Sequence, residues 1–205
     1  MTSDIDRALK AAARGLAEAS APELGRALIE RAEREGLLDV AYTSVDSPLG
    51  ELTVAATPAG LVRVAYLRGR SQDDVLEDLA AKLSPRVLEA PERLDEVRRE
   101  LDEYFEGQRK AFDLPIDWSL THGFTRRVLG ATARIPYGEV GTYAAVAGAA
   151  GSPRAVRAAG NALGSNPMPI VVPCHRVVRT GGALGGYTGG IDRKEFLLRL
   201  EGRLP

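Results

Sequence analysis

The sequence has few of the residues from which disulfides and metal sites are built. Its 205 residues include one cysteine, Cys174, and two histidines, His122 and His175. One cysteine cannot form an internal disulfide, and it cannot supply a zinc site that uses two or more thiolates. With so few imidazoles as well, we expect no structural metal, and no motif in the chain indicates a cofactor.

Long apolar runs are also missing. No stretch of the chain reaches the roughly 18 uninterrupted apolar residues that a membrane helix needs. The N-terminal sequence MTSDIDRALK carries acidic residues where a signal peptide has a basic leader and then an apolar core. We therefore expect a cytoplasmic protein without a membrane partner. We also expect a monomer.

The chain as a whole has almost no excess of either charge, since its formal net charge is −1 at pH 7. That average hides an asymmetry. Residues 1–120 hold 16 Lys and Arg against 24 Asp and Glu, whereas residues 121–205 hold 11 against 4, a balance of +7. All but one of the basic residues in the second part are arginines, which suit contacts with phosphates and bases. The split is either neutral surface variation or the mark of a polyanionic partner.

The first 120 residues indicate helices beside a small sheet. Apolar residues at helical spacing predict helices over 5–19 and 23–34, within an N-terminal helical extension of residues 1–38. Three short β-type runs separated by Pro- and Gly-containing turns predict a three-stranded antiparallel sheet. The strands are expected at 40–45, 51–56 and 61–66, and two acidic amphipathic helices at 72–83 and 91–105. We assign residues 39–120 to an α/β domain.

Residues 121–205 have a mostly helical pattern, so the fold class of the whole chain is α+β. Helices are predicted at 124–135, 142–149, 154–163 and 193–201. Thr142 is expected to cap the second helix, and Ser152 is expected to cap the third with Pro153 at its first position. Two short helices joined by a tight glycine turn are typical of a helix-turn-helix. A glycine-rich loop follows at 180–190.

The third of these helices has almost no side-chain bulk on one face. That face has small residues flanked by two arginines: Ala155, Ala158, Ala159, Gly160, Arg154 and Arg157. Small residues let a partner approach the backbone closely, although the same face could instead pack against another helix of this chain. An arginine within the face suits a groove better than tight helix packing, which favours a ligand.

Cys174 is followed directly by His175, and this pair is the candidate chemical centre. A lone cysteine is commonly a small buried hydrophobe, but a nearby imidazole lowers the thiol pKa and the thiolate is a nucleophile. Adjacent side chains of a strand point to opposite faces, so the pair needs a turn or helix start after Pro173. A carboxylate should orient the histidine, and spacing does not choose among the candidates. These are Glu139, Asp192, Glu195 and Glu201.

The segment PCHRV from Pro173 to Val177 resembles that of the O6-alkylguanine-DNA alkyltransferases, or methylated-DNA–protein-cysteine methyltransferases. Asn166-Pro167 before it and GYTGG at 186–190 after it belong to the same resemblance. The similarity covers most of residues 40–201 and is strongest over 135–201. It implies direct-reversal DNA repair, in which the cysteine takes the alkyl group from O6 of guanine irreversibly in a single turnover. O4-alkylthymine is a further candidate substrate.

The resemblance also implies the roles of individual residues. Cys174 would be the alkyl acceptor, His175 the base that deprotonates it through a water, and Glu201 the carboxylate that orients the histidine. Asn166 would brace the active-site turn, and the Tyr143 hydroxyl would donate a proton to N3 of the departing guanine.

The remaining residues implied by the resemblance would bind double-stranded DNA through a winged helix-turn-helix domain, residues 121–205. Arg157 would fill the base stack after the damaged base is flipped out, while the small-residue helix face enters the minor groove. The carbonyls of Cys174 and Val177 would accept from the guanine amino group, and the loop around Tyr187 and Thr188 would cover the pocket. The residues of the DNA-facing helix are Ala155, Val156, Arg157, Ala158 and Gly160.

Three features depart from the family pattern, and the first is that Thr188 stands where many relatives have serine. The structural zinc of some relatives is excluded because its cysteines are absent, and residues 1–38 have no counterpart in the short family members. Two other functions stay open at this point. The chain could be a DNA-binding regulator whose Cys174 senses alkylation, or a hydrolytic Cys–His enzyme, which would turn over repeatedly on an ester or amide.

Overall fold

The computed structural model describes residues 21–204, so the helix predicted over 5–19 lies outside the described residues. The chain divides into two compact units, with the boundary between Asp39 and Val40. The described part of the first unit contains helix α2 (Ala21–Arg34), which confirms the predicted helix over 23–34. An ion pair between Arg31 and Glu35 at 2.8 Å supports its last turn.

The second unit begins with the predicted meander. Strands β1 (Val40–Val45), β2 (Leu52–Thr57) and β3 (Gly60–Tyr66) pair in antiparallel fashion in chain order. The prediction of three strands was wrong in number, because β4 (Val87–Glu89) adds to the edge of β1 in parallel and gives the order β3-β2-β1-β4. A strand this short shows no alternation of its own, and its place is set by the pairing with β1.

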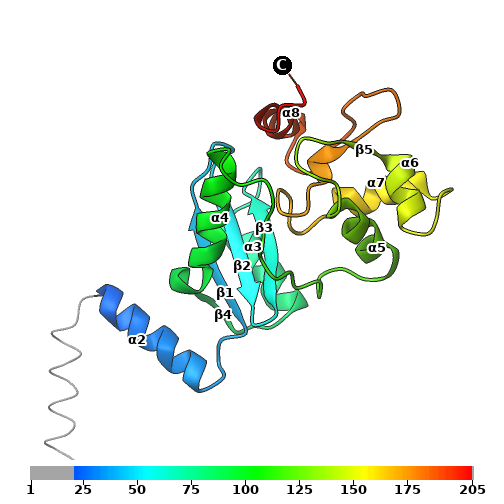
Figure 1. The fold of residues 1–205 in the computed structure, drawn as a ribbon. Coiled ribbons are helices and arrows are strands. Elements are labelled where there is room, and N and C mark those ends of the chain that lie inside the picture. Colours follow the sequence, from blue (N-terminus) through cyan, green and yellow to red (C-terminus); the bar gives the residue numbers. More distant parts are fainter. Residues whose placement is uncertain (1–20, 205) are drawn as a thin grey trace, which may run out of the picture. The chain divides into compact units, whose positions relative to one another are not determined.

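Helix α3 (Gln72–Lys82) packs against the apolar core of the sheet through Val75 and Leu79, and Figure 1 shows helix α4 (Asp95–Phe105) in front of the sheet. A capping box between Ser71 and Asp74 begins α3. The predicted helix over 91–105 is confirmed in outline, but its first turn is the 3₁₀ helix η1 (Pro91–Leu94). Strand β2 is fully buried from Leu52 to Ala55, so the sheet is covered along its middle.

The C-terminal part of this unit is mostly helical, as predicted. Its helices are α5 (Gly123–Thr132), α6 (Tyr143–Ala149), α7 (Val156–Gly164) and α8 (Ile191–Leu200). The predicted cap of α6 is confirmed, because the Ala145 N–H donates to Thr142 Oγ1 at 3.1 Å. A short parallel pair, β5 (Gly141–Thr142) with β6 (Val177–Val178), links the start of α6 to the chain just after His175.

The predicted start of α7 was wrong. Ser152 does not cap the helix, and Pro153 and Arg154 lie in a turn before it. The Ala155 N–H donates to the Ser152 carbonyl at 2.9 Å, which closes that turn with backbone alone, and Ala155 takes the N-cap position without a side-chain cap. The helix therefore begins at Val156.

The fold of the described chain is thus a mixed α+β arrangement, in agreement with the predicted class. Residues 21–204 contain no helix with both the length and the apolar character needed to cross a bilayer.

Candidate active site

The predicted turn after Pro173 is present. Residues Cys174–Arg176 form the 3₁₀ helix η2, in which the Arg176 N–H donates to the Pro173 carbonyl at 2.9 Å. The turn takes Cys174 and His175 out of the strand geometry that would place them on opposite faces. Both side chains are buried, Cys174 at 4% exposure and His175 at 0%. The cysteine is nevertheless one of the residues that line a surface cavity.

Asn166 braces the segment that leads into this turn. Its Nδ2 donates to the Val172 carbonyl at 2.8 Å and to Cys174 Sγ at 3.2 Å, and its Oδ1 accepts from the Met168 N–H at 3.0 Å. Between these contacts the buried Ile170 has a φ of +76°, which is strained for a β-branched residue. The asparagine thus holds a strained loop closed and supplies a donor to the sulfur.

Among the candidate carboxylates, the structure selects Glu201, which follows the last turn of α8. His175 Nε2 lies 2.9 Å from Glu201 Oε1, and both side chains are fully buried. With the Nε2 proton directed to the carboxylate, Nδ1 is the unprotonated nitrogen. Nδ1 is buried and has no hydrogen-bond partner among the described residues, so it is the position from which the imidazole can accept a proton.

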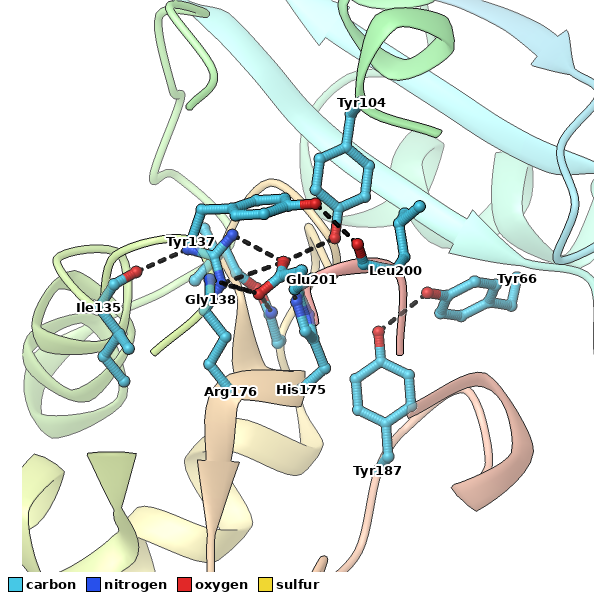
Figure 2. Close-up of polar contacts among 12 residues, drawn as sticks. Tyr66, Tyr104, Ile135, Tyr137, Gly138, His175, Arg176, Tyr187, Leu200 and Glu201 are labelled. Atoms are coloured by element: carbon cyan, nitrogen blue, oxygen red, sulfur yellow. Dashed lines mark hydrogen bonds and ion pairs between the residues drawn. The ribbon is translucent and has the colours of Figure 1, made fainter. Parts of the chain in front are cut away.

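Glu201 is held by three further groups, as Figure 2 shows. Arg176 Nε and Nη2 each donate at 2.9 Å, the Tyr104 hydroxyl donates at 2.8 Å, and the Gly138 N–H donates at 3.3 Å. Burial alone would raise the pKa of Glu201, but the hydrogen bonds from His175 and Arg176 lower it to about 2. The carboxylate is therefore ionised and fixed in orientation at neutral pH.

The protonation states of the central pair follow from their burial. Burial raises the pKa of the Cys174 thiol to about 11, although the Asn166 donor and the charge of Lys194 act in the opposite direction. Burial also lowers the pKa of His175 despite the neighbouring Glu201. At neutral pH the pair is then a thiol beside a neutral imidazole, which is the arrangement a general base requires.

Lys194 on α8 is a component of the site that sequence reasoning missed. Its buried ammonium donates to the carbonyls of Val177 and Leu184, both at 2.5 Å. Burial lowers the pKa of Lys194 to about 8, and interaction with the thiolate form of Cys174 acts in the opposite direction. The lysine fixes the Val177 carbonyl in place, and its positive charge favours the thiolate form of Cys174. Its signal in the sequence was that it is the one lysine of residues 121–205.

The cavity beside Cys174 has a volume of about 320 Å³ and contains several of the predicted residues. It is lined by Tyr143, Gly160, Leu163, Gly164, Cys174, Gly186, Tyr187 and Thr188. Residues from α6, α7, η2 and the loop after β6 thus converge on one hollow. Val177 is buried and is not among the lining residues.

The predicted covering loop forms one wall of the cavity. The Tyr143 hydroxyl donates to the Gly186 carbonyl at 3.4 Å, and Thr188 Oγ1 donates to the Gly164 carbonyl at 2.9 Å. Gly185 has a φ of +69°, and a Cβ there would lie 2.7 Å from the Tyr143 hydroxyl oxygen. The loop can approach Tyr143 so closely only because this residue is glycine.

Helix α7 exposes the residues expected to meet a partner. Val156, Arg157 and Ala158 are exposed and Ala155 is half-buried, while Ala159 is buried in the protein. The alternative that the small-residue face packs within this chain therefore does not apply to Arg157 and Ala158, whereas Ala159 is covered by the protein. Gly160, one turn further along, lines the cavity.

Tyr104 and Arg176 are two further residues that sequence reasoning did not assign to the site. Arg176 follows His175 directly, so its position was a usable signal. Tyr104 lies 97 positions from Glu201, and no local pattern connects them. No group of three or more His, Cys, Asp or Glu side chains within residues 21–204 has the arrangement of a metal site.

Comparison with known proteins bears directly on this arrangement. Residues 123–203 match the model of the 6-O-methylguanine DNA methyltransferase DNA-binding domain, and residues 40–118 match the ribonuclease-like domain of the same proteins. The chain belongs to the methylated-DNA–protein-cysteine methyltransferase family.

Individual members of this family are similar over most of their length. The constitutive methylated-DNA–protein-cysteine methyltransferase of Bacillus subtilis is 42% identical over 161 residues, which is 78% of this chain and 94% of the relative. The human methylated-DNA–protein-cysteine methyltransferase is 39% identical over 168 residues, covering 78% and 79% of the two chains.

The solved structures agree with the sequence relatives. The crystal structure of Mycobacterium tuberculosis OGT in complex with DNA superposes with a TM-score of 0.67 at 38% identity, covering 80% of this chain and 95% of that one. The methyltransferase from the archaeon Pyrococcus kodakaraensis has a TM-score of 0.54 at 25% identity. The enzyme class predicted from the PCHRV segment, a methylated-DNA–protein-cysteine methyltransferase, is confirmed.

Proposed function

We propose that this chain repairs DNA by transferring the alkyl group of O6-alkylguanine irreversibly to Cys174, once per protein molecule. The observation that carries the proposal is the arrangement in one buried cluster of an acceptor thiol, an asparagine donor, and a histidine oriented by a carboxylate, opening on a cavity. O4-alkylthymine in DNA would be a second substrate.

The transfer is a displacement at the alkyl carbon. His175 Nδ1 takes the proton of the Cys174 thiol through a bridging water, and Glu201 stabilises the imidazolium that forms. The sulfur attacks the alkyl carbon, a new S–C bond forms, and the C–O6 bond breaks with its electron pair going to guanine. Because the product is a thioether, nothing in the reaction regenerates the thiol.

The departing guanine needs a proton and a fixed position. In the proposed complex the Tyr143 hydroxyl donates to guanine N3, so that neutral guanine rather than its anion leaves. The carbonyls of Cys174 and Val177 accept from the guanine amino group, and Lys194 supports the second of these by holding its oxygen. Tyr187 and Thr188 belong to the loop that covers the base.

DNA would bind to the C-terminal domain of residues 121–205 as a winged helix-turn-helix, with α6 and α7 as the helix pair and the loop at 180–190 as the wing. Helix α7 would enter the minor groove by the face that contains Ala155, Val156, Ala158 and Gly160, since its small side chains allow close approach. Arg157 would occupy the space of the flipped base. Residues 39–120 form a separate α/β domain in this proposal, and the active protein is a monomer.

Stoichiometry tests the proposal. With a duplex that carries one O6-methylguanine, we expect each protein molecule to remove one methyl group. The reaction then stops, even when the duplex is in excess. Repeated turnover on that duplex, or on an ester or amide, would contradict single-use transfer and favour a hydrolytic Cys–His enzyme.

DNA affinity should depend on Arg157. We expect Arg157→Ala to weaken binding to an O6-methylguanine duplex about tenfold, because the cation–π contacts of a desolvated arginine contribute about 1–2 kcal/mol. Binding of both proteins should fall as salt rises, because phosphate neutralisation releases counterions. Fluorescence anisotropy over a salt series measures both effects.

The matched control is Arg98→Ala, which removes an exposed arginine from α4 on the acidic part of the chain. We expect this variant to bind DNA like the unmodified protein. Equal affinities of Arg157→Ala and Arg98→Ala for the damaged duplex would remove Arg157 from the proposed interface.

A further inference from the structure

Tyr66, the last residue of β3 in the four-stranded sheet, contacts Tyr187 in the wall of the cavity. Its ring is buried, with 9% exposure, and its hydroxyl lies 2.9 Å from the hydroxyl of Tyr187, which lines the cavity. The two rings meet edge to face at 6.2 Å between centroids. Figure 2 shows this pair beside the His175–Glu201 cluster. A residue of the N-terminal sheet thus directly supports a side chain of the candidate active site.

The Tyr66 ring has little freedom to move. The Arg193 guanidinium lies over it at 4.9 Å from the ring centroid, and Arg193 is itself fixed by donating to the carbonyls of Leu49 and Gly189. The loop backbone also lies close to the ring, since a Cβ at Gly189 would lie 2.7 Å from Tyr66 Cε2. The ring is therefore held by a cation and by the loop backbone, and its hydroxyl is a fixed anchor.

The position of Tyr187 depends on this anchor. Its ring lies between Tyr66 and His175, whose ring centroid is 6.4 Å away at an interplanar angle of 88°. Its hydroxyl has no hydrogen-bond partner other than Tyr66 within residues 21–204. Without that bond, the ring would be kept in place by packing alone, on a loop that contains several glycines.

We propose that Tyr66 is a specificity-determining residue, which limits the size of the alkyl group that reaches Cys174 by fixing the Tyr187 ring as a rigid wall. This inference rests on the proposed alkyl transfer. The cavity must hold both the base and its alkyl substituent, and Cys174 and Tyr187 line the same hollow. In this proposal a fixed Tyr187 ring restricts a benzyl group more than a methyl group, because the larger substituent takes up more of the shared hollow.

The test compares two substrates in one duplex sequence, containing O6-methylguanine or O6-benzylguanine. Single-turnover transfer to the full-length chain is followed by the mass of the alkylated protein. We expect Tyr66→Phe to raise the ratio of the benzyl rate to the methyl rate about threefold to tenfold, the effect of losing one hydrogen bond. Tyr66→Phe keeps the contacts of the ring with Arg193 and Gly189, so the packing of the loop is retained.

A double-mutant cycle identifies the shared bond. Tyr187→Phe should raise the same ratio to a similar extent, and the double variant should raise it no further, because both changes remove one interaction. Tyr42→Phe is the matched control, since it removes a tyrosine hydroxyl from β1 of the same sheet. If Tyr66→Phe does not fold, the ratio measured with Tyr187→Phe tests the proposal, because this variant removes the other hydroxyl of the same hydrogen bond.

The outcomes separate this proposal from the proposed function. The ratio of the benzyl rate to the methyl rate could be the same in Tyr66→Phe and Tyr187→Phe as in the unmodified chain and Tyr42→Phe. That result would overturn the role of Tyr66 and leave alkyl transfer intact. Absence of transfer from both substrates to the unmodified chain would instead overturn the proposed function.

Discussion

Replacement of Cys174 by alanine should abolish alkyl transfer while leaving the affinity for damaged DNA close to that of the unmodified chain. The reason is that Cys174 is the only thiol in the 205 residues, so no other sulfur can take over. Loss of a nucleophile commonly lowers a rate by roughly a thousandfold or more. Transfer is measured by single-turnover repair of an O6-methylguanine duplex, and affinity by anisotropy on the same duplex.

The binding measurement makes this variant informative. Cys174 contributes a small buried side chain, and its replacement by alanine removes the sulfur but keeps the backbone carbonyl that is proposed to bind guanine. Retained binding with no transfer would place the cysteine in the chemical step. Transfer that continues in Cys174→Ala would remove it from the acceptor role, and loss of binding together with transfer would indicate a structural effect.

The second large effect is expected at Glu201. Glu201→Gln removes the charge that pairs with His175 and Arg176, leaving the buried guanidinium without its counterion. Removing one partner of a buried ion pair lowers the free energy of unfolding by about 3–5 kcal/mol. Alkyl transfer should also slow by roughly a hundredfold or more, because the imidazolium loses its stabilising carboxylate. Denaturant unfolding and single-turnover repair measure the two effects.

The same carboxylate predicts how stability depends on pH. The folded-state pKa of Glu201 is about 2, below its ordinary value of 4.5. A lowered carboxyl pKa stabilises the folded state fully above the unfolded pKa, and that contribution disappears as the pH falls from about 4.5 toward about 2. It amounts to about 3 kcal/mol. The difference in unfolding free energy between the unmodified chain and Glu201→Gln should therefore narrow over this range.

Glu195→Gln is the matched control, because it changes a half-exposed glutamate on α8 that pairs with Arg199 at 3.6 Å. We expect it to alter the free energy of unfolding by less than about 0.5 kcal/mol and to leave its pH dependence in place. If Glu201→Gln had the same free energy of unfolding and the same transfer rate as Glu195→Gln, the buried carboxylate would neither stabilise the fold nor support His175 in transfer.

Local patterns were sufficient for much of the fold and for the centre of the site. The meander could be predicted because Pro- and Gly-containing turns separate its strands, and the turn at Cys174–His175 because a strand would have kept the two side chains apart. The choice of Glu201 among four carboxylates came from the resemblance, and the structure shows the contact.

Other features depend on contacts that a local pattern does not contain. Strand β4 exists because it pairs with β1, and the turn before α7 closes through backbone atoms rather than through the Ser152 side chain. Tyr104 and Tyr66 reach the site from 97 and 121 positions away in the sequence. Such residues can be found only when the fold brings distant segments together.

The most direct test of this account is the mass of the peptide that contains Cys174 after the protein has reacted with a duplex carrying O6-methylguanine. The account predicts that this peptide gains the mass of one methyl group, that fragmentation places the group on the cysteine sulfur, and that an unmodified duplex produces no gain. A Cys174 peptide of unchanged mass, after the duplex has lost its methyl group, would contradict it.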